Sequence, residues 1–220
     1  MLALEAAREK ILSALPGPTA EIISLNEADG RVLAENISSP VDLPHFDNSA
    51  VDGYAVRAED VRTASATAPS RLKVIGKVAA GENFTGRLNP NESVRLFTGS
   101  PLPAGADAVV MQEDTRLPAE DPASILITDA AAPWENVRLR GVDLKVGELV
   151  AETGTRLHAP LLGLLAAVGV EEVSVARQPT VSLLATGSEL VEAGQPLAPG
   201  KIHESNRLML APLVRAAGAN

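Results

Sequence analysis

The densest group of polar side chains lies in a loop that begins after Pro44 and reads HFDNSAVDGYA over residues 45–55. Gly53 beside them permits close backbone approach or a positive φ. An Asx-rich turn that satisfies its own backbone would use the same residue types, and the spacing leaves both interpretations open. Four of the side chains carry oxygen atoms of the kind that hard cations such as Mg²⁺ prefer: Asp47, Asn48, Ser49 and Asp52.

A second group is the stretch RLFTGSPLP over residues 95–103. It places the hydroxyl of Thr98 at the end of a predicted strand, beside Gly99, whose N–H we expect to be open to an oxyanion. A simple β-turn with proline after serine explains the stretch nearly as well. The pattern by itself is therefore a weak indication of a binding site.

Two arginines, Arg138 and Arg140, alternate in the stretch RLRGVD over residues 138–143. In an extended chain they share one face, where they could clamp a phosphate. Charged side chains on a solvated edge strand would show the same alternation. Both interpretations stand on the pattern alone.

A fourth group, Thr186-Gly187-Ser188-Glu189, follows an apolar run over residues 180–185 that we predict to be a buried parallel strand. Open α/β sheets bind ligands at the carboxyl ends of their strands, although an ordinary strand-to-helix loop would look alike. The motifs of P-loop proteins, dinucleotide-binding enzymes and α/β-hydrolases are absent from the sequence. The groups together fit an anionic substrate with a hard divalent cation.

The amino-acid composition excludes further classes of function. The 220 residues include 28 acidic and 19 basic ones, a formal net charge of −9, which opposes binding to nucleic acid and to anionic membranes. The sequence has no cysteine and its three histidines lie far apart, which excludes thiolate chemistry and an HExxH zinc site. The charged first ten residues and the lack of a long apolar run predict a cytoplasmic protein.

These groups need elements to position them. We predict a helix over residues 2–15 that packs on one side, a helix over 159–168 opened by Pro160 and closed by Gly169, and a helix over 205–217 kinked at Pro212. Between residues 45 and 145, short β-branched runs separated by Gly, Pro and Asn indicate short strands. These runs are 73–78, 93–97, 108–111 and 124–127.

The predicted fold class is α+β and multidomain. Residues 1–44 and 146–176 form a discontinuous mixed α/β domain, and residues 45–145 form a β-rich module inserted into it. Residues 177–220 then begin a doubly wound α/β domain as its first βα unit, and we expect the remainder of that domain to be absent because one strand and one helix cannot complete it.

Five stretches in this order and spacing resemble the MoeA family, the molybdopterin molybdenumtransferases related to the E domain of gephyrin. The first, FDNSAVDGYA over 46–55, is the most specific. The resemblance covers essentially the whole chain and identifies it as the N-terminal part of a family member. The other four stretches are residues 95–103, AVVMQE over 108–113, RGVD over 140–143 and ATGSEL over 185–190.

The resemblance implies an enzyme of molybdenum cofactor biosynthesis. It would insert molybdenum from molybdate into adenylylated molybdopterin with Mg²⁺, releasing AMP. It would work as a homodimer whose site lies between two subunits, with the molybdopterin adenylyltransferase as a possible partner. Four residues match the family's functional positions: Asp52, Thr98, Asp143 and Glu189.

Site assignments follow from the motifs and the resemblance together. Asp52 and Glu189 are the expected Mg²⁺ ligands. Val51 stands where the family usually has Met. Ser188 stands where Asp is common, so Glu189 is the only acidic residue of the loop over residues 186–189. A scaffold module of the gephyrin type and an inactive truncated homologue are the alternatives to an enzyme. The residues expected to bind the cofactor or substrate are Ser49, Gly99, Arg138, Arg140 and Ser188.

Overall fold

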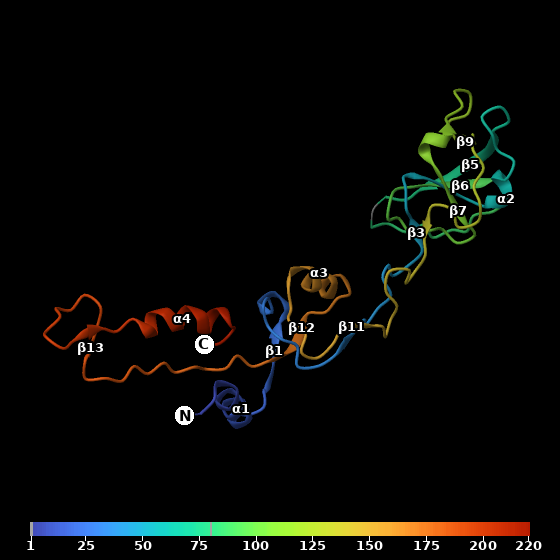
Figure 1. The fold of residues 1–220 in the computed structure, drawn as a ribbon. Helices are drawn as coiled ribbons and strands as arrows, with labels where there is room; N and C mark the ends of the chain where they lie inside the picture. The colour runs from blue at the N-terminus through green and yellow to red at the C-terminus, as the bar shows by residue number, and fades with distance from the viewer. Residues whose placement is uncertain (1, 80) are drawn as a thin grey trace. The chain divides into compact units, whose positions relative to one another are not determined.

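The structure, a computed structural model, describes residues 2–79 and 81–220 (Figure 1). The chain divides into two compact units. The first contains residues Met1–Ser38 and Leu149–Asn220, and the second, Ser39–Glu148, is inserted between these two parts. Helices and sheets occur in both, so the protein is a mixed α/β chain.

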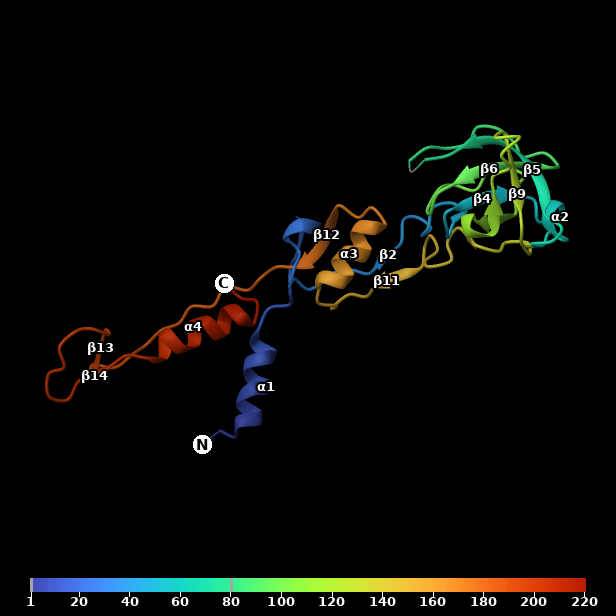
Figure 2. The same cartoon turned by 90° about the horizontal axis from the view of Figure 1, so that it is seen from above.

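A six-stranded sheet dominates the inserted unit, and Figure 2 labels its strands β4, β5, β6 and β9. The order of the strands is β7-β4-β6-β5-β9-β8. Each pair of neighbours is antiparallel except β5 with β6, which are parallel. The four β-branched runs predicted from the sequence are confirmed as β5, β6, β7 and β9. The bounds are β4 Gly53–Val56, β5 Ser70–Lys77, β6 Glu92–Leu96, β7 Ala108–Met111, β8 Thr115–Arg116 and β9 Ser124–Ile127.

Two apolar clusters stabilise this sheet. One contains Leu72, Ile125 and Ile127 together with the short helix α2, Ala58–Val61. The other contains Val94 and Leu96, both fully buried. Because fully burying a Leu or Ile side chain stabilises the folded state by about 1.5–3 kcal/mol, these buried aliphatic side chains stabilise the sheet, and Tyr54 and Phe84 pack against them.

The polar loop before β4 is fixed by a small separate sheet. Strand β3, Asn48–Ser49, pairs antiparallel with β10, Val137–Arg138. A 3-10 turn, η2 Gln112–Asp114, follows β7. The pairing of β3 with β10 brings the first and third polar groups of the sequence onto neighbouring strands.

The first unit is built around strand β1, Ala20–Ser24, which pairs antiparallel with β12, Glu172–Ala176. Helix α3, Ala159–Ala167, has Pro160 in its first turn and ends before Gly169, as predicted. The φ of Gly169 is +83°. The buried core of this unit includes Leu33, Leu157 and Leu165. The remaining elements near this core are η1 Leu25–Glu27, β2 Ile37–Ser38 and its antiparallel partner β11 Leu149–Ala151.

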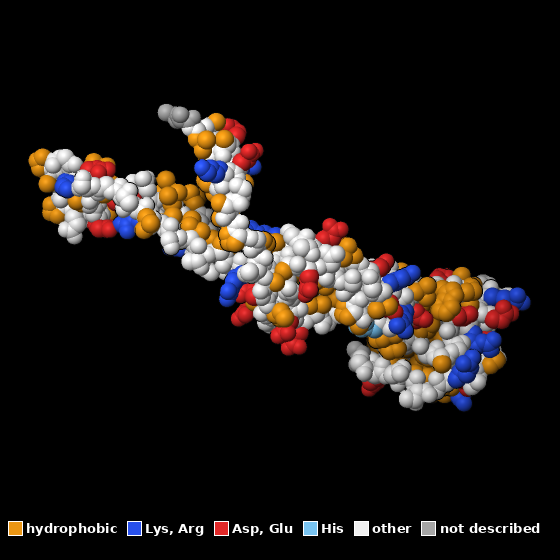
Figure 3. Space-filling view, turned by 90° about the horizontal axis from the view of Figure 1, so that it is seen from below, with side chains coloured by type: hydrophobic (Ala, Val, Ile, Leu, Met, Phe, Trp, Pro, Cys, Tyr) orange, Lys and Arg blue, Asp and Glu red, His pale blue; other side chains and the backbone are white. Residues whose placement is uncertain are grey.

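Helix α1, Leu4–Ala14, forms where the apolar spacing predicts it, but its expected one-sided packing is not present. None of its residues is buried, and Leu4 is 79% exposed. Apolar side chains are visible on the surface of this helix in Figure 3. Among the residues that the structure describes, nothing covers this apolar face.

The predicted buried strand over residues 180–185 is wrong. These residues form no strand, and the side chain of Leu184 is 88% exposed. A parallel strand requires a neighbour to pair with its N–H and C=O groups, and no described strand lies alongside this run. The apolar composition alone was therefore not sufficient to form the strand.

The last part of the chain contains a short parallel pair, β13 Leu190–Val191 with β14 Ile202–His203. Helix α4, Asn206–Ala216, then contains Pro212 and confirms the predicted final helix. None of the helices in the described part of the chain has the length and apolar composition needed to cross a membrane.

Candidate functional site

Asp52 and Thr98 lie together although 46 residues separate them. One carboxylate oxygen of Asp52, Oδ1, accepts hydrogen bonds from both the backbone N–H and the hydroxyl of Thr98, each at 2.8 Å. The other oxygen, Oδ2, accepts no hydrogen bond from any described residue. The pair therefore presents an oriented carboxylate with one oxygen available to a ligand.

The electrostatic surroundings keep this carboxylate ionised. The backbone N–H of Thr98, then its hydroxyl, and to a smaller extent the charge of Arg95 hold the pKa of Asp52 below its ordinary value. Hydrogen bonds to the charged form of a carboxyl group favour that form. At neutral pH Asp52 is thus an anion suited to a cation or to a proton donor.

The register of the large sheet explains why the pair forms. Gly53 at the start of β4 lies opposite Leu96 at the end of β6. Since the two strands are antiparallel, Asp52 just before β4 and the residues just after β6 emerge at the same edge. The motif spacing predicted each residue, and the strand pairing brings them together.

Arg95 borders this edge and was missed by the sequence interpretation. Its guanidinium lies 5.0 Å from the ring centroid of Tyr54 and 5.2 Å from that of Phe97. It also donates to the carbonyl oxygen of Gly53 and to the side-chain oxygen of Gln112. The signal in the sequence that could have identified Arg95 is its position between two apolar residues of one strand, Val94 and Leu96, which are both buried.

Two expected binding groups are occupied by the protein itself. The N–H of Gly99, predicted to be open to an oxyanion, donates to the carbonyl oxygen of Ser49 at 2.8 Å. The hydroxyl of Ser49 is buried and donates to the carbonyl oxygen of Val51 at 2.5 Å. The prediction of an open Gly99 N–H is therefore wrong, because this donor closes the loop on itself. The binding role of Ser49 stays a prediction.

Arg138 and Arg140 do not extend together from one strand. Strand β10 ends at Arg138, and Arg140 lies in the turn that follows. Arg138 pairs with the carboxylate of Asp143 at 2.5 Å, with both side chains about half exposed. The structure thus joins the predicted Arg138 to the predicted Asp143.

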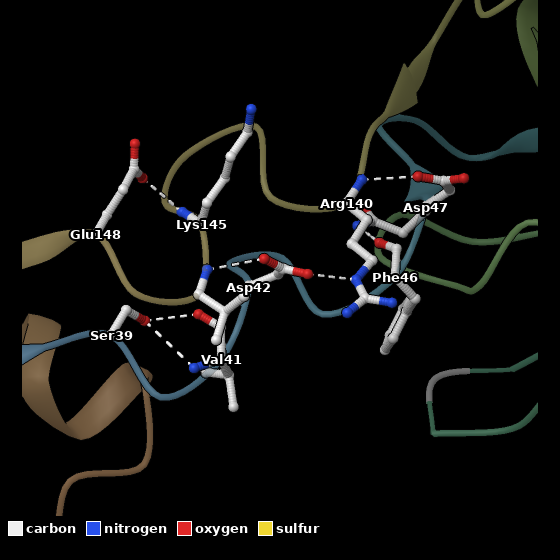
Figure 4. A network of polar contacts seen from close by, with 10 residues as sticks. Ser39, Val41, Asp42, Phe46, Asp47, Arg140, Lys145 and Glu148 are labelled. Carbon is white, nitrogen blue, oxygen red and sulfur yellow. Dashed lines mark hydrogen bonds and ion pairs between the residues drawn. The ribbon is translucent and has the colours of Figure 1, made fainter.

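Arg140 lies in a separate network near the base of the inserted unit (Figure 4). Its Nε donates to Asp42 at 2.5 Å, and its backbone N–H donates to the carboxylate of Asp47 at 2.7 Å. Asp42 also accepts the N–H of Val146 at 2.9 Å. Asp42 is not among the residues predicted from the sequence, in which its only signal is its place as a lone acid between Pro40 and Pro44.

The network holds the two segments that lead into and out of the inserted unit. Leu43 and Leu144 form an antiparallel bridge, and the backbones of Ser39 and Glu148 are also hydrogen bonded, at 2.8 Å. The N–H of Val146 and the side chain of Arg140 lower the pKa of Asp42, in that order of effect. Asp42 is therefore a charged acceptor at neutral pH.

Ser188 and Glu189 lie in an exposed turn of the first unit, which precedes β13. The backbone carbonyl of Ser188 accepts a hydrogen bond from Nζ of Lys201 at 2.5 Å. These two residues belong to a different unit from Asp52, Thr98, Arg138 and Asp143. Their predicted roles stay predictions.

Metal binding has limited support in the geometry. In residues 2–79 and 81–220, no group of three or more His, Cys, Asp or Glu side chains is arranged to hold a metal ion. Mg²⁺ commonly needs one or two carboxylates, waters and substrate phosphates rather than a cage of protein ligands. The available carboxylate oxygen of Asp52 fits this mode of binding, and the described residues do not form a site made of several protein ligands.

Comparisons with known proteins agree with the fold and with these motifs. The crystal structure of the molybdopterin biosynthesis MoeA protein from Pyrococcus horikosii superposes with a TM-score of 0.87 at 40% identity, covering 100% of this chain and 55% of that one. A second structure from Pyrococcus horikoshii OT3 gives 0.82 at 39% identity, with 90% and 52% coverage. The fold and the motifs therefore place the chain in one structural class with these two proteins.

The family follows from the sequence comparisons. The family model of the MoeA N-terminal region, domains I and II, matches residues 2–169, and the chain belongs to this family. The molybdopterin molybdenumtransferase of Haemophilus influenzae is 43% identical over 208 residues, 94% of this chain and 50% of that protein. The Nostoc protein of the same name is 42% identical over 199 residues, 90% of this chain and 45% of that protein.

The resemblance stated from the motifs is thus confirmed at the level of the family. The chain spans about half the length of the curated relatives it matches. Residues 170–220 lie outside the match to the family model.

Proposed function

We propose that this chain supplies one wall of the site of a molybdopterin molybdenumtransferase. The reaction inserts molybdenum from molybdate into the dithiolene of adenylylated molybdopterin and releases AMP. The relatives named molybdopterin molybdenumtransferase support the transferase class. The single observation that carries the proposal for this chain is the Asp52–Thr98 pair.

Asp52 is the central residue of the proposed site. Thr98 fixes one of its oxygens by two hydrogen bonds, so the second oxygen points in one direction without rotating freely. With substrate phosphates this oxygen would hold Mg²⁺, which when bound neutralises phosphate charge. Asp52 and Thr98 thereby orient the reacting end of the substrate.

The arginines serve the anionic part of the substrate in this proposal. Arg138 is half exposed and turned toward Asp143, and Arg140 is 63% exposed. Guanidinium groups form charge-assisted, often bidentate, hydrogen bonds with phosphate oxygens. We assign the pterin phosphate or the AMP phosphate to them, and we assign Ser188 and Glu189 to the contribution of the partner subunit in the proposed homodimer.

The proposal includes a homodimer, with the site shared between subunits, and delivery of the adenylylated substrate by the molybdopterin adenylyltransferase. Both parts rest on the resemblance. Sedimentation of the purified chain measures its oligomeric state, and a monomer at micromolar concentration would argue against self-association through this part.

A chimera tests the function. The chain replaces the matching half of the Haemophilus influenzae relative, and AMP release from adenylylated molybdopterin is measured with and without molybdate and Mg²⁺. We expect molybdate-dependent release, and its loss in the chimera carrying Asp52→Asn. Asp121→Asn, at an exposed acid paired with Arg71 in the same unit, is the control.

A folded chimera in which Asp52→Asn retains the full rate of AMP release would remove Asp52 from the site. A folded chimera without any release, beside an active parent enzyme, would show that this chain does not supply the wall. Unchanged release in Asp121→Asn is required for either conclusion, because it shows that removing an exposed charge alone has no effect.

A further inference from the structure

Arg140 is held at two points by two different carboxylates. Asp47 accepts its backbone N–H, and Asp42 accepts its side-chain Nε. Asp42 is itself fixed by the N–H of Val146 and is only 14% exposed, whereas the side chain of Arg140 is 63% exposed. An exposed arginine is therefore anchored on a nearly buried acid.

This anchoring leaves the outer edge of the guanidinium available. The two terminal amino groups, Nη1 and Nη2, make no hydrogen bond to any described residue, and Figure 4 shows the contact with Asp42 at Nε. An open hollow of about 420 Å³ adjoins the group. Its lining consists of Pro40, Val41, Asp42, His45, Arg140 and Val146.

We propose that Asp42 is a positioning residue for Arg140, directing its two terminal amino groups to bind a tetrahedral oxyanion in this hollow. The pair of amino groups forms a planar fork, which matches two oxygens of a phosphate or of molybdate. The inference rests on the proposed function, which assigns an anion to Arg140, and adds the residue that orients it.

Electrostatics and positioning predict opposite effects for Asp42. A carboxylate beside Arg140 offsets part of its positive charge, so removing that charge should strengthen anion binding if charge alone matters. Holding Nε restricts the rotamers of a long side chain, whose ordering otherwise opposes binding. The sign of the change in Asp42→Asn therefore separates the two effects.

The experiment measures binding of two probes, AMP and molybdate, to the 220-residue chain by NMR titration at fixed ionic strength. The variants are Arg140→Ala, Asp42→Asn and Asp42→Glu, with Asp121→Asn as the matched control, since Asp121 also accepts a backbone N–H and pairs with an arginine. The signal of the Arg140 Nε–H reports whether the side chain stays anchored.

We expect Arg140→Ala to weaken binding of one probe about tenfold, and the responding probe identifies a phosphomonoester or molybdate as the anion. Asp42→Asn should weaken the same probe about threefold to tenfold and accelerate exchange of the Arg140 Nε–H. Asp42→Glu keeps the charge but displaces the acceptor by one methylene, and should also weaken binding. Asp121→Asn should bind like the parent chain.

Three results would overturn the inference. If Asp42→Asn binds the probe as tightly as the parent chain, or more tightly, Asp42 acts by charge and does not position Arg140. If Asp42→Asn does not fold, Asp42→Glu decides, and unchanged binding there has the same meaning. If Arg140→Ala binds both probes normally, the anion role of Arg140 fails as well, while the Asp52 test in the chimera still stands.

Discussion

The backbone of Gly53 lies so close to the carbonyl group of Val110 that a Cβ atom at position 53 would overlap the carbonyl oxygen. Gly53 begins β4, directly after Asp52, and Val110 is in the neighbouring strand β7. Gly53 therefore allows two strands to approach each other closely. Close backbone approach and a positive φ were the two roles predicted for it from the sequence. This approach fixes where Asp52 leaves the sheet.

Replacing Gly53 with Ala should destabilise the inserted unit by about 1–3 kcal/mol or more, because the backbones of β4 and β7 must separate. Urea unfolding monitored by circular dichroism measures this. Gly163→Ala in helix α3 is the control, since nothing lies within 4 Å of a Cβ there. The control should stabilise the protein by about 0.5–1 kcal/mol. Equal stability of Gly53→Ala and the parent chain would contradict the packing argument.

The hydrogen bonds of Thr98 should make stability depend on pH. Since the folded pKa of Asp52 is lowered, its contribution is present above the unfolded value of about 3.9 and disappears as the pH falls through the folded value. Thr98→Val removes the hydroxyl donor and should raise the pKa of Asp52. The stability difference between parent and variant should therefore be largest near neutral pH and shrink in acid.

Thr128→Val is the control for that series, because the Thr128 hydroxyl donates to the backbone carbonyl of Asp114, which does not titrate. Its stability difference should stay constant as the carboxyl group of Asp52 titrates. NMR titration of the Asp52 side-chain carbon measures the pKa directly. The same midpoint in the parent chain and in Thr98→Val would show that the hydroxyl has no effect.

Arg138→Ala should weaken binding of adenylylated molybdopterin in the chimera by about 1.5–3 kcal/mol, the range for hydrogen bonds to charged groups. Calorimetric titration at two salt concentrations measures the loss and its salt dependence. Arg71→Ala removes another exposed arginine paired with carboxylates in the same unit. Equal affinities and salt dependence for both variants would show that Arg138 is only a solvated partner of Asp143.

Hydrogen exchange should be fast at residues 182–185, whose amides make no hydrogen bond to a described residue. The amides of β12, paired with β1, should exchange much more slowly. Val181 differs from its neighbours because its N–H donates to the carbonyl oxygen of Asn220 at 2.8 Å. Slow exchange over 182–185 would show that this run is protected by pairing that the structure lacks.

The sequence by itself determined the elements whose signals are local. Apolar spacing with Pro160 and Gly169 predicted α3, and β-branched runs between turn residues predicted β5, β6, β7 and β9. It also identified Asp52 and Thr98 as separate candidates and their motifs as those of the family. Such signals suffice because helix ends and strand runs depend on residues a few positions apart.

Tertiary structure alone decided which groups meet and which remain available. The register of β4 with β6 brings Thr98 to Asp52, and loop closure removes the N–H of Gly99 from the predicted oxyanion site. The acid that anchors Arg140 lies 98 residues away in the chain. Hydrogen bonds and strand pairs between distant residues depend on how the whole sheet assembles, so no local pattern specifies them.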